Sequence, residues 1–207
     1  MRESWINKNM LSTLLLRVRT PLSWAIGQTY FGHVKTINRL KTIGELGRKV
    51  MEEKLKVGHK AKGFTLTDQS EQEFRLAGFK GKRILLSFHP LAWTSVCAEQ
   101  MKSLEKTKDT FESLNTIAVG VSVDTVPSKK AWADSLGIRN TRLLSDFWPH
   151  GKVARLYGIF RREDGFSERA NTIIDENQKI AFFKIYKLGQ LPDIQEIVDV
   201  LRKMPKN

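Results

Sequence analysis

The single cysteine of this chain, Cys97, follows a proline and a threonine at short spacing. The segment from His89 to Cys97 reads His-Pro-Leu-Ala-Trp-Thr-Ser-Val-Cys, so that Thr94 and Pro90 both precede the thiol. A thiolate is the nucleophilic form of cysteine, and polar or cationic neighbours favour it. Taken alone, a lone cysteine is more often a small buried apolar residue than a catalyst. Chemistry at sulfur is therefore a hypothesis that the surrounding elements must support.

The residues on either side of this segment predict a strand before the cysteine and a helix after it. Residues 83–88 form a short apolar run that ends at Pro90, which is typical of a buried strand. Residues 98–111 lack glycine and proline and repeat apolar side chains at helical spacing. Cys97 is therefore expected at the start of a helix. The backbone N–H groups there lack intrahelical partners and favour negative charge.

The remaining pattern predicts an α/β fold with a central mixed β-sheet flanked by helices. Strands and helices alternate along the chain, with a hairpin at each end of the series. We expect an N-terminal β-hairpin over 64–76, further strands over 116–123, 143–145, 168–174 and 179–186, and helices over 128–136, 152–157 and 194–203.

The pattern Pro90-x-x-x-Thr94-x-x-Cys97 resembles the active-site signature of the peroxiredoxins. The likeness extends from about Val57 to Leu201 and is nearest to the one-cysteine, AhpE-like and thioredoxin-peroxidase-like branch. This resemblance implies a thioredoxin-like fold with an added N-terminal β-hairpin. It also implies a thiol-dependent peroxidase that reduces hydrogen peroxide or organic hydroperoxides, with Cys97 becoming a sulfenic acid.

The same resemblance implies roles for the neighbours of the thiol. The Thr94 hydroxyl would accept one hydrogen bond and donate another to a peroxide oxygen, and Pro90 would shield the sulfur without adding a backbone donor. Arg169, at the start of a predicted strand, would stabilise the thiolate and orient peroxide through several donors. Many relatives carry glutamate three residues after the cysteine to hold this arginine, and here that position is Gln100. Gln100 can accept the same hydrogen bond without charge assistance, or it is a plain residue of the helix surface.

One cysteine also limits how the sulfenic acid could be reduced. No intramolecular disulfide can form, so we expect an external thiol reductant: thioredoxin, a glutaredoxin-like protein or a small thiol. The histidines show no metal-ligand spacing, so we expect neither a metal nor another cofactor. His89 is not expected to act as a base, because an arginine-stabilised thiolate needs none. We further expect a homodimer.

More than half of the net charge of +13 lies in the first fifty residues. Residues 1–50 contain nine basic and two acidic residues, a net of +7, which leaves +6 for residues 51–207. The latter show no basic stripe interleaved with aromatic residues, so no nucleic-acid partner is expected. The apolar run 11–16 is too short to span a bilayer, so no membrane partner is expected either.

We expect two parts in the chain: a basic N-terminal extension over 1–50 and a peroxiredoxin domain over 51–207. The extension is expected to be poorly ordered or to lie upstream of a natural start at Met51. A mitochondrial transit peptide and a basic arm that binds anionic partners remain open. The corresponding location is the cytoplasm, or mitochondria if the segment is a transit peptide.

Two functions other than a peroxidase also remain open. One is a non-enzymatic redox sensor in which oxidation of Cys97 changes a protein partnership. The other is a binding protein that uses the basic arm, with the thiol incidental. A thioredoxin-fold disulfide reductase is disfavoured because Cys97 lacks a C-x-x-C partner. Turnover with peroxide and an external thiol separates the enzyme from the sensor.

Overall fold

The structure is a computed structural model that describes residues 55–205. The predictions for residues 1–50, namely the basic extension, the transit peptide and the arm, lie outside this range, as does the proposed start at Met51.

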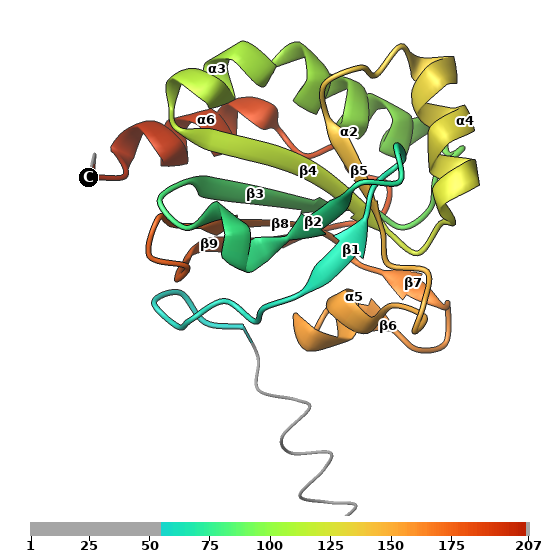
Figure 1. The fold of residues 1–207 in the computed structure, drawn as a ribbon, viewed down its shortest axis with the longest axis horizontal. Coiled ribbons are helices and arrows are strands. Elements are labelled where there is room, and N and C mark those ends of the chain that lie inside the picture. Colours follow the sequence, from blue (N-terminus) through green and yellow to red (C-terminus); the bar gives the residue numbers. More distant parts are fainter. Residues whose placement is uncertain (1–54, 206–207) are drawn as a thin grey trace, which may run out of the picture. The chain divides into compact units, whose positions relative to one another are not determined.

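Seven strands of the described part form one mixed sheet (Figure 1): β1 (Thr65–Thr67), β2 (Glu73–Arg75), β3 (Arg83–Phe88), β4 (Thr116–Ser122), β5 (Arg142–Ser145), β8 (Arg169–Ile174) and β9 (Ile180–Tyr186). Their order across the sheet is β2-β1-β5-β4-β3-β8-β9. The central strands β5, β4 and β3 run parallel, and the pairs on both sides of them are antiparallel. The predicted central mixed sheet and its N-terminal hairpin are confirmed.

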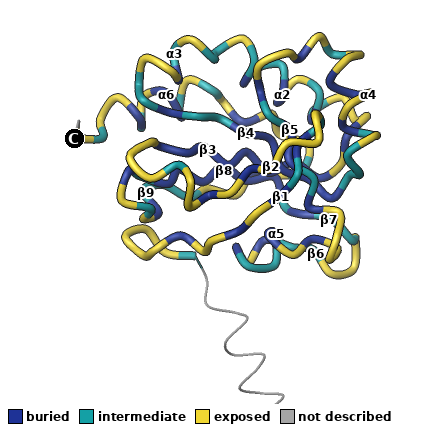
Figure 2. Tube along the Cα trace, viewed as in Figure 1, coloured by how far each residue is buried: buried dark blue, intermediate teal, exposed yellow. Residues whose placement is uncertain are grey.

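Helices cover both faces of this sheet (Figure 1): α2 (Ser95–Lys106), α3 (Lys108–Ser113), α4 (Val126–Leu136) and α6 (Ile194–Lys203) on one face, and the short α5 (Lys152–Leu156) on the other. Every residue of β3 and β8 is buried as a result, as Figure 2 shows for the middle of the sheet. A strand covered on both faces is expected to be apolar throughout, which explains the apolar run at 83–88. None of the helices within residues 55–205 has the length and apolar composition needed to cross a membrane.

The structure differs from the predictions in several local features. The helix predicted over 98–111 begins earlier, at Ser95, and is interrupted at Thr107, where α2 ends and α3 begins. The Thr107 N–H bonds to the carbonyls of Ser103 and Leu104 (3.1 and 3.2 Å), a tightened last turn that closes α2. A 3₁₀ helix, η1 (Leu76–Phe79), and a hairpin of two-residue strands, β6 (Phe160–Arg161) and β7 (Phe166–Ser167), were not predicted because elements this short carry little periodicity.

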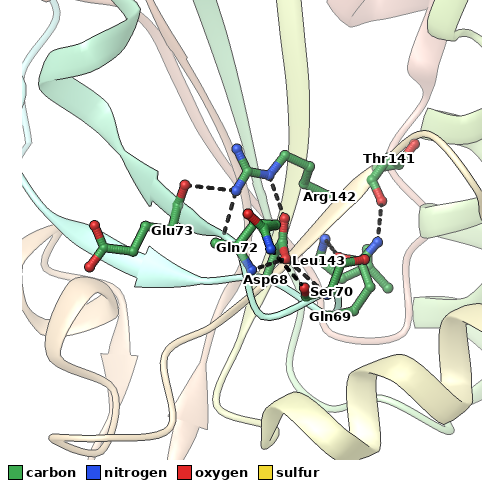
Figure 3. A network of polar contacts seen from close by, with 8 residues as sticks. All are labelled: Asp68, Gln69, Ser70, Gln72, Glu73, Thr141, Arg142 and Leu143. Atoms are coloured by element: carbon green, nitrogen blue, oxygen red, sulfur yellow. Dashed lines mark hydrogen bonds and ion pairs between the residues drawn. The ribbon is translucent and has the colours of Figure 1, made fainter.

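A carboxylate in the N-terminal hairpin ties that hairpin to the parallel part of the sheet (Figure 3). Asp68 Oδ1 accepts from the backbone N–H groups of Ser70 and Gln72 (2.8 and 2.9 Å), which fixes the turn between β1 and β2. Its Oδ2 accepts from Arg142 Nε at the start of β5 (2.6 Å). Gln69 adds two hydrogen bonds to the backbone of the same region. The hairpin is thereby held against β5 by polar contacts as well as by packing.

Candidate active site

Cys97 is a free, fully buried thiol in the first turn of α2. The helix has Thr94 as its N-cap, and the first backbone hydrogen bond of the turn runs from the Ala98 N–H to the Thr94 carbonyl (2.9 Å). The amide of Cys97 itself therefore precedes the regular hydrogen bonding of the helix. Because α2 starts at Ser95, the thiol lies within the first turn of the helix and not ahead of it. The positive end of the helix dipole still lies beside the sulfur.

Arg169 reaches the thiol because its strand runs antiparallel to β3. Phe88 at the end of β3 pairs with Ala170, so that Arg169 lies next to the loop that leads to Cys97. Its Nη2 donates to Cys97 Sγ at 3.3 Å, and its Nε donates to the carbonyl of Leu188 at 2.9 Å. The arginine side chain is buried and permanently charged. The structure thus brings together Cys97 and Arg169, the two residues that the family resemblance assigns to one site.

Gln100 holds the arginine from α2. Its side-chain carbonyl accepts a hydrogen bond from Arg169 Nη1. Its amide group donates to Ser87 Oγ (2.7 Å) and to the Phe88 carbonyl (3.2 Å). Only 2% of Gln100 is exposed, so the alternative that it is a plain residue of the helix surface is wrong. An uncharged side chain occupies this position and uses both ends of its amide, one for the cation and one for strand β3.

The loop between β3 and α2 places the remaining motif residues. Pro90 is buried at the start of this loop. Thr94 is exposed, and its hydroxyl donates to the carbonyl of Leu91 (3.0 Å). No hydrogen bond joins Thr94 to Cys97 within the described residues. The expected donation from this hydroxyl to a peroxide oxygen differs from the structure, in which the one O–H is directed at Leu91. The hydroxyl oxygen still has acceptor capacity for a thiol or a peroxide O–H.

Two contacts from the region around the N-terminus of α4 fix the middle of this loop. The Ala92 N–H donates to Asp124 Oδ2 (2.9 Å), and the indole N–H of Trp93 donates to Ser128 Oγ (3.0 Å). Trp93 has a φ of +66°, a left-handed conformation that is rare for a large residue. The two tethers hold the backbone in this conformation and thereby set where the first turn of α2 begins.

His89 and Lys129 are two further polar side chains that are fully buried. The His89 ring packs against Trp132 with centroids 5.3 Å apart. Burial, followed by the charges of Lys129 and Arg169, holds the pKa of His89 well below its usual value, so the imidazole is neutral at neutral pH.

Two groups of this region were not predicted from the sequence: Lys129 and the carbonyl of Leu188. Lys129 occurs at helical spacing with the buried residues Trp132 and Ala133, and a basic residue at such a core-facing position was the signal available for it. The Leu188 carbonyl has no side-chain signature in a sequence. Residues 55–205 contain no group of three or more His, Cys, Asp and Glu side chains that could hold a metal ion.

This arrangement suits nucleophilic chemistry at sulfur. A guanidinium and a helix N-terminus both favour the thiolate over the thiol, and a thiolate attacks an electrophilic oxygen. The surrounding buried side chains keep bulk water from the sulfur, which strengthens each electrostatic contact in the site.

Comparison with known proteins agrees with this chemistry. Residues 57–183 match the AhpC/TSA family. The chain is 37% identical over 148 residues to alkyl hydroperoxide reductase E of Mycobacterium tuberculosis, covering 71% of this chain and 96% of that protein. It is 31% identical over 147 residues to the mitochondrial thioredoxin-dependent peroxide reductase of Drosophila melanogaster, covering 68% of this chain and 61% of that protein.

A solved structure supports the fold. The reduced 2-Cys peroxiredoxin of Plasmodium vivax superposes with a TM-score of 0.65 at 29% identity, over 70% of this chain and 80% of that one. The predicted thioredoxin-like fold is confirmed by this likeness together with the mixed sheet and its flanking helices. The chain therefore belongs to the AhpC/TSA family, the peroxiredoxins.

Proposed function

We propose that Cys97 is the residue of this protein that reacts with peroxide. The chain is a thiol-dependent peroxidase, as its family and relatives indicate. The observation that supports Cys97 most directly is the buried contact of 3.3 Å between its Sγ and Arg169 Nη2. In the reaction, the thiolate sulfur attacks one peroxide oxygen, the S–O bond forms and the O–O bond breaks. Cys97 becomes a sulfenic acid, and the leaving oxygen gains a proton as water or alcohol.

The neighbouring residues have separate tasks in this proposal. Arg169 stabilises the thiolate and directs its donors at the peroxide oxygens, while Gln100 and the Leu188 carbonyl keep the guanidinium in place. Thr94 accepts a hydrogen bond from the peroxide O–H and so orients it toward the sulfur. Pro90 shields the sulfur and supplies no competing N–H.

Reduction of the sulfenic acid is assigned to an external thiol. Cys97 is the single cysteine of the chain, so the resolving sulfur belongs to another molecule. Thioredoxin, a glutaredoxin-like protein and a small thiol are the three candidates. Each would attack the sulfenic sulfur, release water, and leave a mixed disulfide that a second thiol reduces.

Intact-protein mass spectrometry tests the assignment to Cys97. The reduced protein is mixed with one equivalent of hydrogen peroxide in the presence of dimedone, which traps sulfenic acid. We expect one adduct per chain in the wild type and none in Cys97→Ser, whose circular dichroism is unchanged. Catalytic peroxide consumption with an added thiol separates an enzyme from a redox sensor, which would be oxidised without turnover. Equal peroxide consumption by Cys97→Ser would refute the assignment.

We also propose that the protein forms a homodimer through the end of the sheet that carries the active site. Two pairs of exposed apolar residues follow the carboxyl ends of the parallel strands β3 and β5: Leu91 and Trp93, and Phe147 and Trp148. Large exposed apolar residues that gather at one end of a sheet favour a protein–protein contact. Sedimentation of the full chain at micromolar concentration tests this, and a monomer across that range would exclude it.

A reducing compartment, the cytoplasm, is the location we propose. The support is the free thiol and its need for an external thiol reductant, since such thiols are maintained in reducing compartments. Mitochondria are the alternative if residues 1–50 act as a transit peptide. Cell fractionation of the full chain, compared with a chain that starts at Met51, distinguishes the two.

A further inference from the structure

Buried polar side chains lead away from Arg169 across one face of the sheet. Gln100 accepts from Arg169 through its side-chain carbonyl and donates through its amide group to Ser87 Oγ at 2.7 Å. Ser87 in turn donates to Asn171 Oδ1 at 2.8 Å. Ser87 and Asn171 are partners in the register of β3 with β8, and each of these four residues is at most 2% exposed. A polar group left unpaired at such a position is costly, so these contacts are favoured.

The contacts continue through β9 to the surface of α6. Asn171 Nδ2 donates to the Tyr186 hydroxyl at 3.5 Å, the longest of these contacts, and that hydroxyl donates to Glu196 Oε2 at 3.0 Å. Tyr186 is buried and lies directly opposite Arg169 in the register of β8 with β9. Glu196 is partly exposed, and its other oxygen accepts from Lys184 Nζ at 2.6 Å. The polar row defined by these contacts consists of Gln100, Ser87, Asn171 and Tyr186.

The donors of the polar row all point the same way, from the guanidinium toward the surface carboxylate. A guanidinium has no acceptor, so Gln100 turns its carbonyl to Arg169 and its amide group to Ser87. Ser87 accepts this bond and keeps its single O–H for Asn171 Oδ1. Asn171 then presents its amide group to the Tyr186 oxygen, and the Tyr186 O–H is left for a carboxylate. Because a cation lies at one end and an anion at the other, the aligned bonds polarise and strengthen each other.

We propose that Tyr186 and Glu196 are positioning residues that hold the Arg169 guanidinium at the thiol through the polar row. The Glu196 carboxylate fixes the Tyr186 hydroxyl, and the row then keeps the Gln100 carbonyl turned toward Arg169. A glutamate at position 100 would meet the arginine with its own charge, whereas the neutral Gln100 depends on the more distant carboxylate. This inference deepens the proposed function, because it assigns residues that position the arginine of the same site.

The first measurement is a thiolate titration of the reduced protein, which needs no peroxide. Ultraviolet absorbance of the thiolate is followed against pH in the full-length wild type, Tyr186→Phe and Glu196→Gln, each corrected by its Cys97→Ser counterpart. Tyr186→Phe changes no charge, and we expect its midpoint to rise by about 0.5 pH unit because Arg169 is held less firmly. Glu196→Gln removes a negative charge, which through space alone would lower the midpoint. We expect a rise here as well, and a midpoint at or below the wild-type value in either variant would overturn the proposal.

Two control variants separate the polar row from the surface around it. Lys184→Met removes the ion pair with Glu196 and leaves the bond from Tyr186 in place. Asp199→Asn removes one negative charge from an exposed position of the same helix. We expect the wild-type midpoint in both variants, because salt screens exposed charges. A rise in Lys184→Met as large as that in Glu196→Gln would assign the effect to the surface ion pair and overturn the proposal.

The second measurement tests whether the effect passes through the polar row. Ser87→Ala interrupts the row between Gln100 and Asn171, so Tyr186→Phe is expected to have no further effect in that background. We expect each single variant to lose about 3- to 10-fold in the second-order rate with hydrogen peroxide. The double variant is expected to lose no more than the larger single loss. Losses that multiply would indicate two independent effects and would contradict the proposal.

These measurements distinguish a failure of the positioning from a failure of the proposed peroxidase activity. A wild type that peroxide does not oxidise would refute the activity. The thiolate midpoints of the same single and double variants would still decide whether Tyr186 and Glu196 act on Arg169. If Tyr186→Phe does not fold, as judged by circular dichroism, Glu196→Gln takes its place in both measurements, since its side chain is partly exposed.

Discussion

At the scale of single residues, the site depends on how one guanidinium divides its donors. Arg169 donates from three different nitrogens to three acceptors: the Leu188 carbonyl, the Gln100 side chain and Cys97 Sγ. A planar fork with fixed donor directions satisfies all three at once, whereas a lysine ammonium at the end of a flexible stem does not. The guanidinium is therefore held against the sulfur in one orientation.

This geometry predicts different outcomes for two substitutions of Arg169. Arg169→Ala removes the charge, so we expect the midpoint of thiolate formation to rise by on the order of one to three pH units and oxidation by peroxide to slow strongly. Arg169→Lys keeps a charge but loses the fork, so we expect a smaller rise and still a slow reaction. Thiolate absorbance and stopped-flow rates measure the two effects. An unchanged titration in Arg169→Ala would mean that another cation holds the thiolate.

Thr94 allows a matched pair of variants, because only its hydroxyl is needed in the proposed reaction. Thr94→Val removes the acceptor that orients the peroxide, and we expect a loss of about 10- to 100-fold in the second-order rate, comparable to losing one positioning hydrogen bond. Thr94→Ser keeps the hydroxyl and is expected to retain most of the rate. Valine also removes the hydrogen bond to Leu91, so the melting temperature of both variants is compared. Equal rates for valine and serine would remove Thr94 from the mechanism.

The sequence allowed only part of this site to be predicted. Cys97, Pro90 and Thr94 are close in the chain, so a local pattern identifies them. Arg169 is far from them in sequence, and its place required the resemblance, because an isolated arginine is usually a surface residue. Lys129 lies at helical spacing with the buried Trp132 and Ala133, but its burial was not predicted because a lysine is usually exposed.

At the scale of elements, α2 carries the thiol at one end and a hydrogen-bonded carboxylate at the other. Its first turn carries the thiol, and Glu105 near its last turn accepts hydrogen bonds from the segment that leads into β5. The Glu105 carboxylate accepts from the backbone N–H groups of Arg139 and Asn140 (2.9 Å each) and from the N–H and hydroxyl of Thr141 (2.7 and 2.6 Å). This anchor fixes α2 along its length relative to the parallel strands.

The protonation of Glu105 gives this anchor a defined pH dependence. Burial opposes ionisation, but hydrogen bonds from the Thr141 hydroxyl and from three backbone N–H groups outweigh it and lower the pKa of Glu105 to about 2. A carboxyl group whose pKa is lower in the folded state contributes stability above its unfolded pKa, and this contribution is lost as the pH falls toward 2. We expect Glu105→Gln to melt below the wild type at pH 7 and the difference to shrink between about pH 4.5 and pH 2.

The control for Glu105→Gln is Glu99→Gln on the same helix. Glu99 is exposed and contacts only Lys102 at 3.1 Å among the described residues, a surface pair that is worth little. We expect its melting temperature to follow the wild type at every pH. A pH-independent difference between wild type and Glu105→Gln would show that the glutamine changes packing and not the charged anchor.

Strands and helices with a long apolar periodicity were predicted well, and local features that depend on tertiary contacts were not. The strands over 83–88 and 116–122 and the helix over 194–203 have apolar spacing that the burial of the sheet enforces. No glycine or proline near Thr107 indicates that the helix is interrupted there. The interruption depends on how α2 and α3 each pack on the sheet. The apolar periodicity of the sequence continues across Thr107 without change.

At the scale of the whole molecule, residues 55–205 contain a complete sheet and every residue assigned to the site. All seven strands of this sheet, both layers of helices and the two apolar clusters on its faces are formed by this part of the chain. The match to the AhpC/TSA family lies within the same range, at residues 57–183. Residues 55–205 therefore contain the elements of this fold and the residues of the proposed chemistry.

A chain that starts at Met51 tests this reading of the whole molecule. We expect it to unfold with a free energy within about 0.5 kcal/mol of the full chain, because no strand, core residue or site residue described here is removed. We expect its rate with peroxide to be unchanged as well, since Cys97, Arg169 and Thr94 keep their partners. The net charge falls from +13 to +6, so non-specific binding to anionic surfaces should weaken. Melting temperatures and second-order rates are compared at two salt concentrations. A loss of several degrees or a clear loss of rate would mean that residues 1–50 stabilise the domain or complete its pocket.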